Sequence, residues 1–496
     1  MNSSRRLARQ LFMSLTLACL IGLLGYPRPC AASERKNVLF IVSDDLTNNA
    51  LSCYGGAVAK SPQIDRLASR GVRFDRAYCQ FPLCNPSRSS FMTGLRPDTT
   101  RVYDNAAEFR KLRPQTQTLP QTFRKAGYFV ARVGKLYHYG VPSQIGTSGL
   151  DDPASWDHVV NPRGKDKDDE PQIFSLSPGN FGGTVSWLAA QGTDAQQTDG
   201  LGAAATIKLL EEKAAQPFFI ACGFYRPHTP YVAPRAYFDL HPIERFRLPE
   251  VDPARLARGP APAFASAKRE QDRLKGELGL QAIQAYHAST TFMDAQLGLV
   301  LDALDRLKLA DKTIVVFFSD HGYHLGEHGL WQKMSLFENS ARVPLIIYAP
   351  GAAGNGKACG RTVELSDLHA TLADLCGIQA PATDGVSLAP LIAQPDRPWD
   401  RPALTQVTRG LPRQAGAKKP QDKGKDRSFM GYSLRTEQHR LTVWGGGEHG
   451  VELYDYATDP LEQRNLASDP AHAQLVESLR KQLELATARA TGRQAP

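Results

Sequence analysis

Four short apolar runs recur along the first two thirds of the chain, and each one ends in a cluster of polar residues. The runs are residues 37–42, 128–133, 218–223 and 313–318. Apolar residues fill consecutive rather than alternate positions in these runs, which is typical of strands in a parallel sheet that is covered on both faces. The sequence therefore predicts at least four buried strands of one sheet.

Helical patterns lie between these runs. Residues 62–70 follow a capping Ser61 and stop at Gly71, and residues 281–307 keep an apolar stripe. Strands that alternate with helices predict an α/β fold with one large doubly wound sheet, mixed but mostly parallel, flanked by helices. Ligands of such sheets bind beyond the carboxyl ends of the strands, so we expect the polar clusters there to converge on one site.

The pattern changes near residue 400. Residues 409–428 are rich in Lys, Gly, Pro and Gln and predict a flexible loop or linker. The segments that follow predict a small antiparallel sheet and a helix; they are 429–435, 440–444, 451–456 and 471–489. We therefore expect a main domain over 33–400 and a smaller C-terminal subdomain over 401–496.

The N-terminus has the pattern of an export signal. Three arginines precede an apolar run of 15 residues at 11–25, and Cys30-Ala31-Ala32 offers small residues for cleavage. Fifteen helical residues rise only about 22 Å, short of the ~30 Å of a hydrocarbon core. We therefore predict a signal peptide over 1–32 and no permanent membrane span. A short uncleaved membrane helix is the alternative, and Arg5-Arg6 permits a twin-arginine route.

Charge and cysteine content exclude several classes of protein. The formal net charge of +9 is accounted for by four arginines of the predicted signal and by the basic excess of 409–427. The remaining chain is formally neutral, which argues against a nucleic-acid-binding face. Without Cys19 and Cys30, six cysteines remain, with no CxxC pair, so no disulfide or zinc framework is expected.

One cysteine stands in a chemically suggestive position. Cys84 begins the segment Cys84-Asn85-Pro86-Ser87-Arg88, in which Pro86 suits the first turn of a helix and Gly94 its end. Cys84 should thus lie at a helix N-terminus, where unpaired N–H groups favour negative charge. The alternative is an inert buried cysteine, which is the usual state of a free thiol.

Acidic residues end two of the predicted strands. Asp44, Asp45 and Asp320 offer hard carboxylate oxygens that suit Ca²⁺ or Mg²⁺. A bare Asp-Asp pair is more often a turn or a helix cap, but a third acid after a second strand favours a metal. His324 and His328 also suggest zinc, although Gly326 interrupts the helix that would place both on one face. Zinc is therefore the less favoured interpretation, and we expect these two histidines to be loop residues or residues that surround the metal ligands.

The Cys84 motif resembles the signature of the sulfatase family, in which the cysteine is converted to formylglycine. The resemblance spans nearly the whole mature chain; its further motifs are Gly134-Lys135 with His138, Pro227-His228-Thr229-Pro230, Ser319-Asp320-His321-Gly322, Gly329-Leu330-Trp331-Gln332-Lys333 and Leu453-Tyr454-Asp455 with Asp459-Pro460. Within the family it is most similar to the iduronate-2-sulfatase group, notably in 96–101 and 431–435. His321 agrees with that group, since many other sulfatases have Asn there.

The resemblance implies a complete set of site residues. The implied metal ligands are Asp44, Asp45, the modified Cys84, Asp320 and His321, with Ca²⁺ expected in preference to Mg²⁺. The implied sulfate-binding and catalytic residues are Cys84, Arg88, Lys135, His138, His228 and Lys333. In the implied mechanism, one hydroxyl of hydrated formylglycine attacks sulfur, and His228 or Lys333 gives a proton to the leaving oxygen. His138 then takes the proton of the second hydroxyl, which expels sulfate.

These features predict an exported, calcium-dependent hydrolase of an O-sulfated sugar, for example a 2-O-sulfated uronate. A choline sulfatase, a phosphoester hydrolase and a non-catalytic glycan-binding relative are the alternatives. The expected partners are a sulfated carbohydrate and a formylglycine-generating or anaerobic sulfatase-maturating enzyme. Residues 151–180 and 235–273 are expected to shape the pocket. The resemblance also implies that Arg96, Asp98 and His228 contact the sugar.

The expected location is periplasmic or secreted. The one Asn-x-Ser/Thr acceptor, at Asn2, falls within the predicted signal, so the mature chain has no N-glycosylation site. An enzyme sorted to lysosomes by its glycans would need such a site.

Overall fold

The computed structural model describes residues 35–410 and 428–491, without the side chains of 255–257 and 489–491. The predicted signal at 1–32 and most of the predicted loop at 409–428 lie outside these residues. Residues 37–496 form one unit by their internal contacts, and the account below concerns that unit.

A mixed eight-stranded sheet carries the fold, in the order β13-β2-β12-β9-β1-β7-β3-β4. Its strands are β1 (Asn37–Ser43), β2 (Val72–Tyr78), β3 (Phe129–Gly134), β4 (His158–Val160), β7 (Phe218–Gly223), β9 (Thr313–Ser319), β12 (Arg342–Tyr348) and β13 (Ala358–Glu364). All neighbours are parallel except β12, which runs antiparallel to both β2 and β9. The four predicted strands are β1, β3, β7 and β9, and the predicted mixed, mostly parallel sheet is confirmed.

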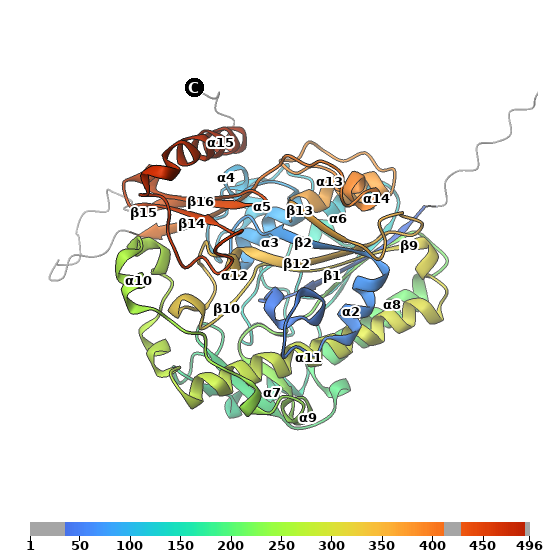
Figure 1. Ribbon diagram of the computed structural model, residues 1–496. Coiled ribbons are helices and arrows are strands. Elements are labelled where there is room, and N and C mark those ends of the chain that lie inside the picture. The colour runs from blue at the N-terminus through green and yellow to red at the C-terminus, as the bar shows by residue number, and fades with distance from the viewer. Residues whose placement is uncertain (1–34, 411–427, 492–496) are drawn as a thin grey trace, which may run out of the picture. The chain divides into compact units, whose positions relative to one another are not determined.

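Both faces of this sheet are buried, which explains the unbroken apolar runs. In β1, Leu39 and Ile41 face one core, whereas Phe40 and Val42 face the other. Helices cover the first face, and they are α2 (Pro62–Arg70), α8 (Thr198–Lys213) and α11 (Glu277–Arg306). The second face is covered by α3 (Cys84–Thr93), α6 (Leu119–Lys125), α13 (Asp367–Leu375) and α14 (Ala389–Ala393), as Figure 1 shows. Each strand residue therefore finds an apolar partner on whichever side it points.

The C-terminal part forms a four-stranded antiparallel sheet, as expected, with one strand more than the sequence indicated. It contains β14 (Ala403–Gly410), β15 (Ser428–Arg435), β16 (His439–Trp444) and β17 (Val451–Asp455). Helix α15 (Ala473–Thr491) packs Leu479 and Leu483 on one face of this sheet. Val407 and Trp444 on the other face pack against Phe337 of the main fold.

The structure corrects the predicted loop at 409–428 at both of its ends. Arg409 and Gly410 belong to β14 and pair with Phe429 and Ser428 of β15. A strand was missed here because residues 403–410 mix polar and apolar side chains and have little hydrophobic periodicity of their own.

Smaller elements complete the fold on the side of α8 and α11. They are β5 (Phe174–Ser175), β6 (Ser186–Ala190) and β8 (Tyr231–Pro234), which form a three-stranded sheet, and the hairpin of β10 (His324–Leu325) and β11 (Trp331–Gln332). None of the six cysteines from Cys53 onward forms a disulfide bond among the described residues. Among the described residues, no helix combines the length and the apolarity needed to cross a membrane.

Buried His369 should make the fold sensitive to acid. Its Nδ1 lies 3.1 Å from the carbonyl oxygen of Thr93, and its Nε2 lies 2.8 Å from the hydroxyl oxygen of Thr122. Burial lowers the pKa of His369 to about 4, because a charged ring would lose its hydration. An unfolded histidine titrates near 6.5, so the unfolded state binds more protons between these pH values and stability falls as the pH falls.

We expect His369 to contribute up to about 3 kcal/mol to the free energy of unfolding at neutral pH. This contribution is lost as the pH falls toward 4. Chemical denaturation at pH 7.5 and 4.5 measures the loss. His369→Gln should lower stability at pH 7.5 and reduce the difference between the two pH values, whereas exposed His158→Gln should leave that difference unchanged. An equal pH dependence in the His369 variant and the wild type would contradict this account.

Candidate active site

The carboxyl ends of β1 and β9 bring four of the predicted site residues together. The two strands are parallel neighbours in which Ser43 pairs with Ser319. Asp44 and Asp45 leave β1 at the level where Asp320 and His321 leave β9, and all four side chains are fully buried. Burial of three carboxylates so close together is costly unless cations or hydrogen bonds compensate.

Cys84 lies beside these residues at the start of α3, as predicted. Pro86 stands in the first turn of this helix, and Gly94, at a φ of 71°, ends it. The Cys84 Sγ is fully buried, 3.4 Å from His321 Nε2 and 3.7 Å from Asp44 Oδ1. The thiol thus occupies the centre of the acidic cluster.

Arg88, one turn further along α3, ties the two strand ends together. Its Nε donates to Asp320 Oδ2 at 2.9 Å and its Nη2 to Asp44 Oδ1 at 3.0 Å. Nη1 donates to the carbonyl oxygens of Lys135 and Leu136 at 2.7 and 3.1 Å. Arg88, which the resemblance implied as a sulfate-binding or catalytic residue, therefore directs its guanidinium to two carboxylates of the chain itself, and its side chain is fully buried.

Two lysines approach the same acids from other segments. Lys135, directly after β3, donates to Asp44 Oδ2 at 2.5 Å. Lys333, directly after β11, donates to Asp45 Oδ1 at 2.5 Å and lies 3.2 Å from Cys84 Sγ. Lys333 is flanked by two left-handed residues, Gln332 at a φ of 68° and Met334 at 74°. Such a conformation is unusual for residues other than glycine, so this segment is strained to place the Lys333 ammonium.

The surrounding positive charges favour the anionic form of residue 84. Burial alone would raise the pKa of the Cys84 thiol, but Lys135, Lys333 and His321 together lower it well below its usual value. Burial likewise opposes the charged form of Asp44, yet its pKa is lowered, mainly by Lys135. The site is therefore arranged to hold negative charge at the N-terminus of α3.

The histidines of the site divide into two groups. His138 helps to lower the pKa of the Cys84 thiol, and His228 Nε2 is 3.8 Å from Asp45 Oδ2. His324 and His328 lie elsewhere, as expected: His324 Nε2 bonds to Ser335 Oγ at 2.7 Å, and the His328 ring stacks on Phe337. Among the described residues, neither histidine is part of the groups of side chains that could hold a metal ion.

The donor atoms of the site fit a divalent cation. Asp44, Cys84, Asp320 and His321 each offer one ligand atom within 4.8 Å of the others, and so do Asp44, Asp45, Cys84 and His228. The Asp45 Oδ2 is buried and has no hydrogen-bond partner. His321 directs Nδ1 to the carbonyl oxygen of Gly322 at 3.0 Å, which leaves Nε2 facing the acids. An unpartnered buried carboxylate oxygen among hard oxygen donors is what Ca²⁺ or Mg²⁺ would compensate.

A pocket of about 820 Å³ opens above this cluster. His138, His228 and Lys333 line it, whereas Cys84 and the acids lie below its floor. Both segments expected to shape the pocket contribute, one through Glu170 and 179–180 and the other through 265–268. Residues 181–183 and Arg409 also line it and were not singled out by the sequence.

Two expected sugar contacts are corrected by the structure. Arg96 donates through Nη1 and Nη2 to both carboxylate oxygens of Glu364, at 2.6 and 2.5 Å. Asp98 accepts from the hydroxyls of Tyr103 and Tyr432 and from the amide of Gln406. Both side chains are buried away from the residues that line the pocket, so they stabilise the fold around α3 instead. His228 does line the pocket.

Comparison with known proteins agrees with this geometry. The sulfatase family model matches residues 36–378. The chain is 33% identical to iduronate 2-sulfatase of Mus musculus, over 95% of this chain and 98% of that protein. It is 32% identical to choline-sulfatase of Rhizobium meliloti (strain 1021), over 88% and 83% of the two chains. A phosphonate monoester hydrolase of Agrobacterium radiobacter shares the fold, with a TM-score of 0.75 at 23% identity over 92% of this chain and 96% of that chain.

The chain therefore belongs to the sulfatase family, and it is a sulfuric ester hydrolase. Its large mixed sheet and its C-terminal antiparallel sheet are those that the hydrophobic pattern predicted. Members of this family generally use a formylglycine and a divalent metal, and the described residues contain a cluster suited to both.

Asp45→Asn should weaken binding of Ca²⁺ by more than about 10-fold, because it removes one carboxylate charge from the cluster. Calorimetric titration of the metal-free protein measures this affinity. Asp294→Asn is a matched control, since Asp294 is also buried but accepts from the backbone N–H groups of Gln63 and Ile64 at the start of α2. Equal calcium affinity of the Asp45 variant and the control would show that this cluster does not hold the metal.

Proposed function

We propose that this protein removes O-sulfate from a sulfated sugar, with a formylglycine made from Cys84 as the nucleophile and a bound calcium ion. The observation that carries the proposal is the position of the Cys84 Sγ, 3.2 Å from Lys333 Nζ and 3.4 Å from His321 Nε2, beneath a pocket large enough for a saccharide. Sulfatase relatives across most of the chain support it.

The proposed metal ligands are Asp44, Asp45, Asp320, His321 and residue 84. When bound, the cation would offset the charge of the acids and of the sulfate and would make a hydroxyl at residue 84 easier to deprotonate. Arg88 holds Asp44 and Asp320 in place for this task through its Nε and Nη2 contacts.

We assign the remaining polar residues by their distance from residue 84. Lys333 reaches the reacting group from the pocket side and Lys135 from below, at 4.0 Å from Sγ, so both can contact sulfate oxygens. His228 or Lys333 donates a proton to the leaving sugar oxygen, since both line the pocket. We assign His138, which lines the pocket and influences the pKa of the Cys84 thiol, to accept a proton from residue 84.

The maturating enzyme is a required partner in this proposal, of the formylglycine-generating or the anaerobic sulfatase-maturating class. Residue 84 and all other residues of α3 are buried in the folded chain. The modification must therefore precede the packing of α3 against the sheet.

We propose a 2-O-sulfated uronate as the substrate, because an iduronate 2-sulfatase matches the chain over almost its full length. A choline sulfatase or a phosphoester hydrolase is the second candidate, since a choline-sulfatase is nearly as similar. We further propose a periplasmic or secreted enzyme with a signal peptide at 1–32, a catalytic domain at 33–400 and a C-terminal subdomain at 401–496.

Release of sulfate from a panel of sulfated sugars, choline sulfate and a phosphate ester tests the proposal. We expect the enzyme matured in a host with a maturating enzyme to act on the sulfated uronate with the highest kcat/KM. Cys84→Ala should lose at least about 10³-fold, because the nucleophile is removed.

Cys376→Ala is the matched control for this experiment, because Cys376 lies at the end of α13, away from the site, and is only partly buried. It should retain the wild-type rate. Full activity of the Cys84 variant would refute the nucleophile, and a higher kcat/KM on choline sulfate or the phosphate ester would refute the sugar assignment.

A further inference from the structure

Two cations in the pocket wall have no carboxylate partner among the described residues. Of the basic side chains that line the pocket, Lys333 is paired with Asp45, whereas Arg409 and Lys268 form no ion pair. The acid that lines the pocket, Glu170, is already paired with Lys167. The pocket therefore carries more positive charge than one sulfate monoester would neutralise.

Arg409 is the more unusual of the two, because its side chain is buried. The residue is only 6% exposed, and its recorded hydrogen bonds go to the carbonyl oxygens of Pro262, Thr408 and Met334. Burial without an acidic partner lowers the pKa of Arg409 to about 10. A buried guanidinium is costly unless a negative charge compensates it, so an anion in the pocket would stabilise it.

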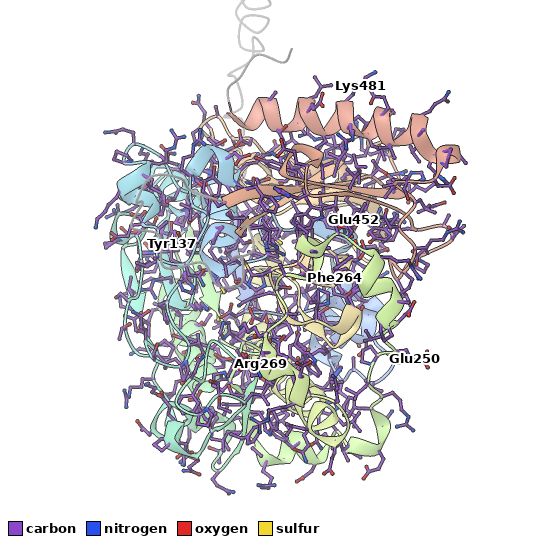
Figure 2. All side chains as sticks on the ribbon, turned by 90° about the vertical axis from the view of Figure 1, so that its left-hand side faces the viewer. Tyr137, Glu250, Phe264, Arg269, Glu452 and Lys481 are labelled. Atoms are coloured by element: carbon purple, nitrogen blue, oxygen red, sulfur yellow. The ribbon has the colours of Figure 1, made fainter. Side chains whose placement is uncertain are left out.

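Lys268 reaches the same region from the loop between α10 (Pro253–Arg258) and α11. Its Nζ donates to Gln332 Oε1 at 2.6 Å and to the carbonyl oxygen of Gly183. Between Lys268 and Pro262, the hydroxyl of Ser266 also lines the pocket and is buried without a hydrogen-bond partner. Phe264 and Arg269, labelled in Figure 2, flank Ser266 and Lys268 in the chain.

Arg409 and Lys268 both contact the segment 332–334, which also carries Lys333 to Cys84. Arg409 contacts the carbonyl of Met334, and Lys268 contacts the side chain of Gln332, the two left-handed residues on either side of Lys333. Lys333 itself reaches Cys84. A ligand with its sulfate at Cys84 would thus have these unpaired donors further along the pocket wall.

We propose that Arg409 and Lys268, with the Ser266 hydroxyl, form a second anion subsite that binds the carboxylate of a sulfated uronate. The subsite rests on the proposed function and selects, among sulfated sugars, those that carry a carboxylate besides the sulfate ester. A guanidinium can bind both oxygens of a carboxylate, whereas the lysine adds a point charge. The strand β14 of the C-terminal sheet thereby supplies a specificity residue to the main fold.

The test compares a 2-O-sulfated uronate disaccharide with its methyl ester, which has the same sugar and sulfate but no carboxylate charge. For the wild type we expect a higher kcat/KM on the acid. Arg409→Gln should lower the ratio of kcat/KM for acid over ester by roughly 10- to 100-fold, mainly through KM, as expected for a lost charge-assisted hydrogen bond. Lys268→Gln should lower this acid-over-ester ratio less than Arg409→Gln does. Arg409→Lys should give a ratio between those of Arg409→Gln and the wild type.

Exposed Arg306→Gln is the control and should keep the wild-type ratio. If Arg409 only holds Met334 and thereby positions Lys333, its substitution would lower the rates on acid and ester equally, and the subsite would be refuted. An unchanged ratio would refute it as well.

A binding measurement separates failure of the subsite from failure of the proposed function. Calorimetry on Cys84→Ala should show tighter binding of the acid than of the ester, and Arg409→Gln in that background should remove the difference. An enzyme that releases no sulfate from either compound would contradict the proposed function. Equal binding of acid and ester by Cys84→Ala would contradict the subsite, whatever the turnover.

Discussion

The structure depends on the neutralisation of three carboxylates buried at the ends of two adjacent strands. Asp44, Asp45 and Asp320 meet because β1 and β9 are parallel and in register, and all three side chains are fully buried. Arg88, Lys135 and Lys333 come from three other segments and donate to these acids. One buried oxygen of the cluster, Asp45 Oδ2, has no hydrogen bond, and His228 Nε2 lies 3.8 Å from it.

The same constraint explains why so much of the surrounding structure is rigid and buried. Every residue of α3 is buried, and its N-terminus points residue 84 at the acids. The strained residues Gln332 and Met334 hold Lys333 in reach of both Asp45 and Cys84. Strain of this kind persists only where the surroundings stabilise it, here through contacts to Lys268 and Arg409. The residues on either side of Lys333 therefore connect the acids at the strand ends to the wall of the pocket.

Most of the central fold could be predicted from the sequence because its strands are buried on both faces. The run at 37–42 is apolar throughout, and its end could be identified by Asp44 and Asp45. In contrast, β2 has charged residues at Arg73, Asp75 and Arg76, and β14 mixes polar with apolar positions, so neither has a clear pattern. Strands at a sheet edge, or with only one face covered, have weaker hydrophobic patterns in the sequence than strands that are buried on both faces.

Some of the site residues could likewise be predicted from local sequence, whereas others could not. Residues in motifs next to strand ends converge as predicted, because the position of a strand end is set by local sequence. Arg96 was expected at the sugar, yet it pairs with Glu364, a residue 268 positions away that no local pattern could indicate. Arg409 was assigned to a loop for a similar reason, since its hydrogen-bond partners Pro262 and Met334 come from distant segments.

Anomalous diffraction from crystals of the naturally matured enzyme, grown with calcium, tests the central claim most directly. The account predicts one cation within about 2.3–2.6 Å of oxygens from Asp44, Asp45 and Asp320 and of residue 84 as a hydrated aldehyde. Cation-free density with an intact thiol at residue 84, in crystals of a preparation that releases sulfate, would contradict it.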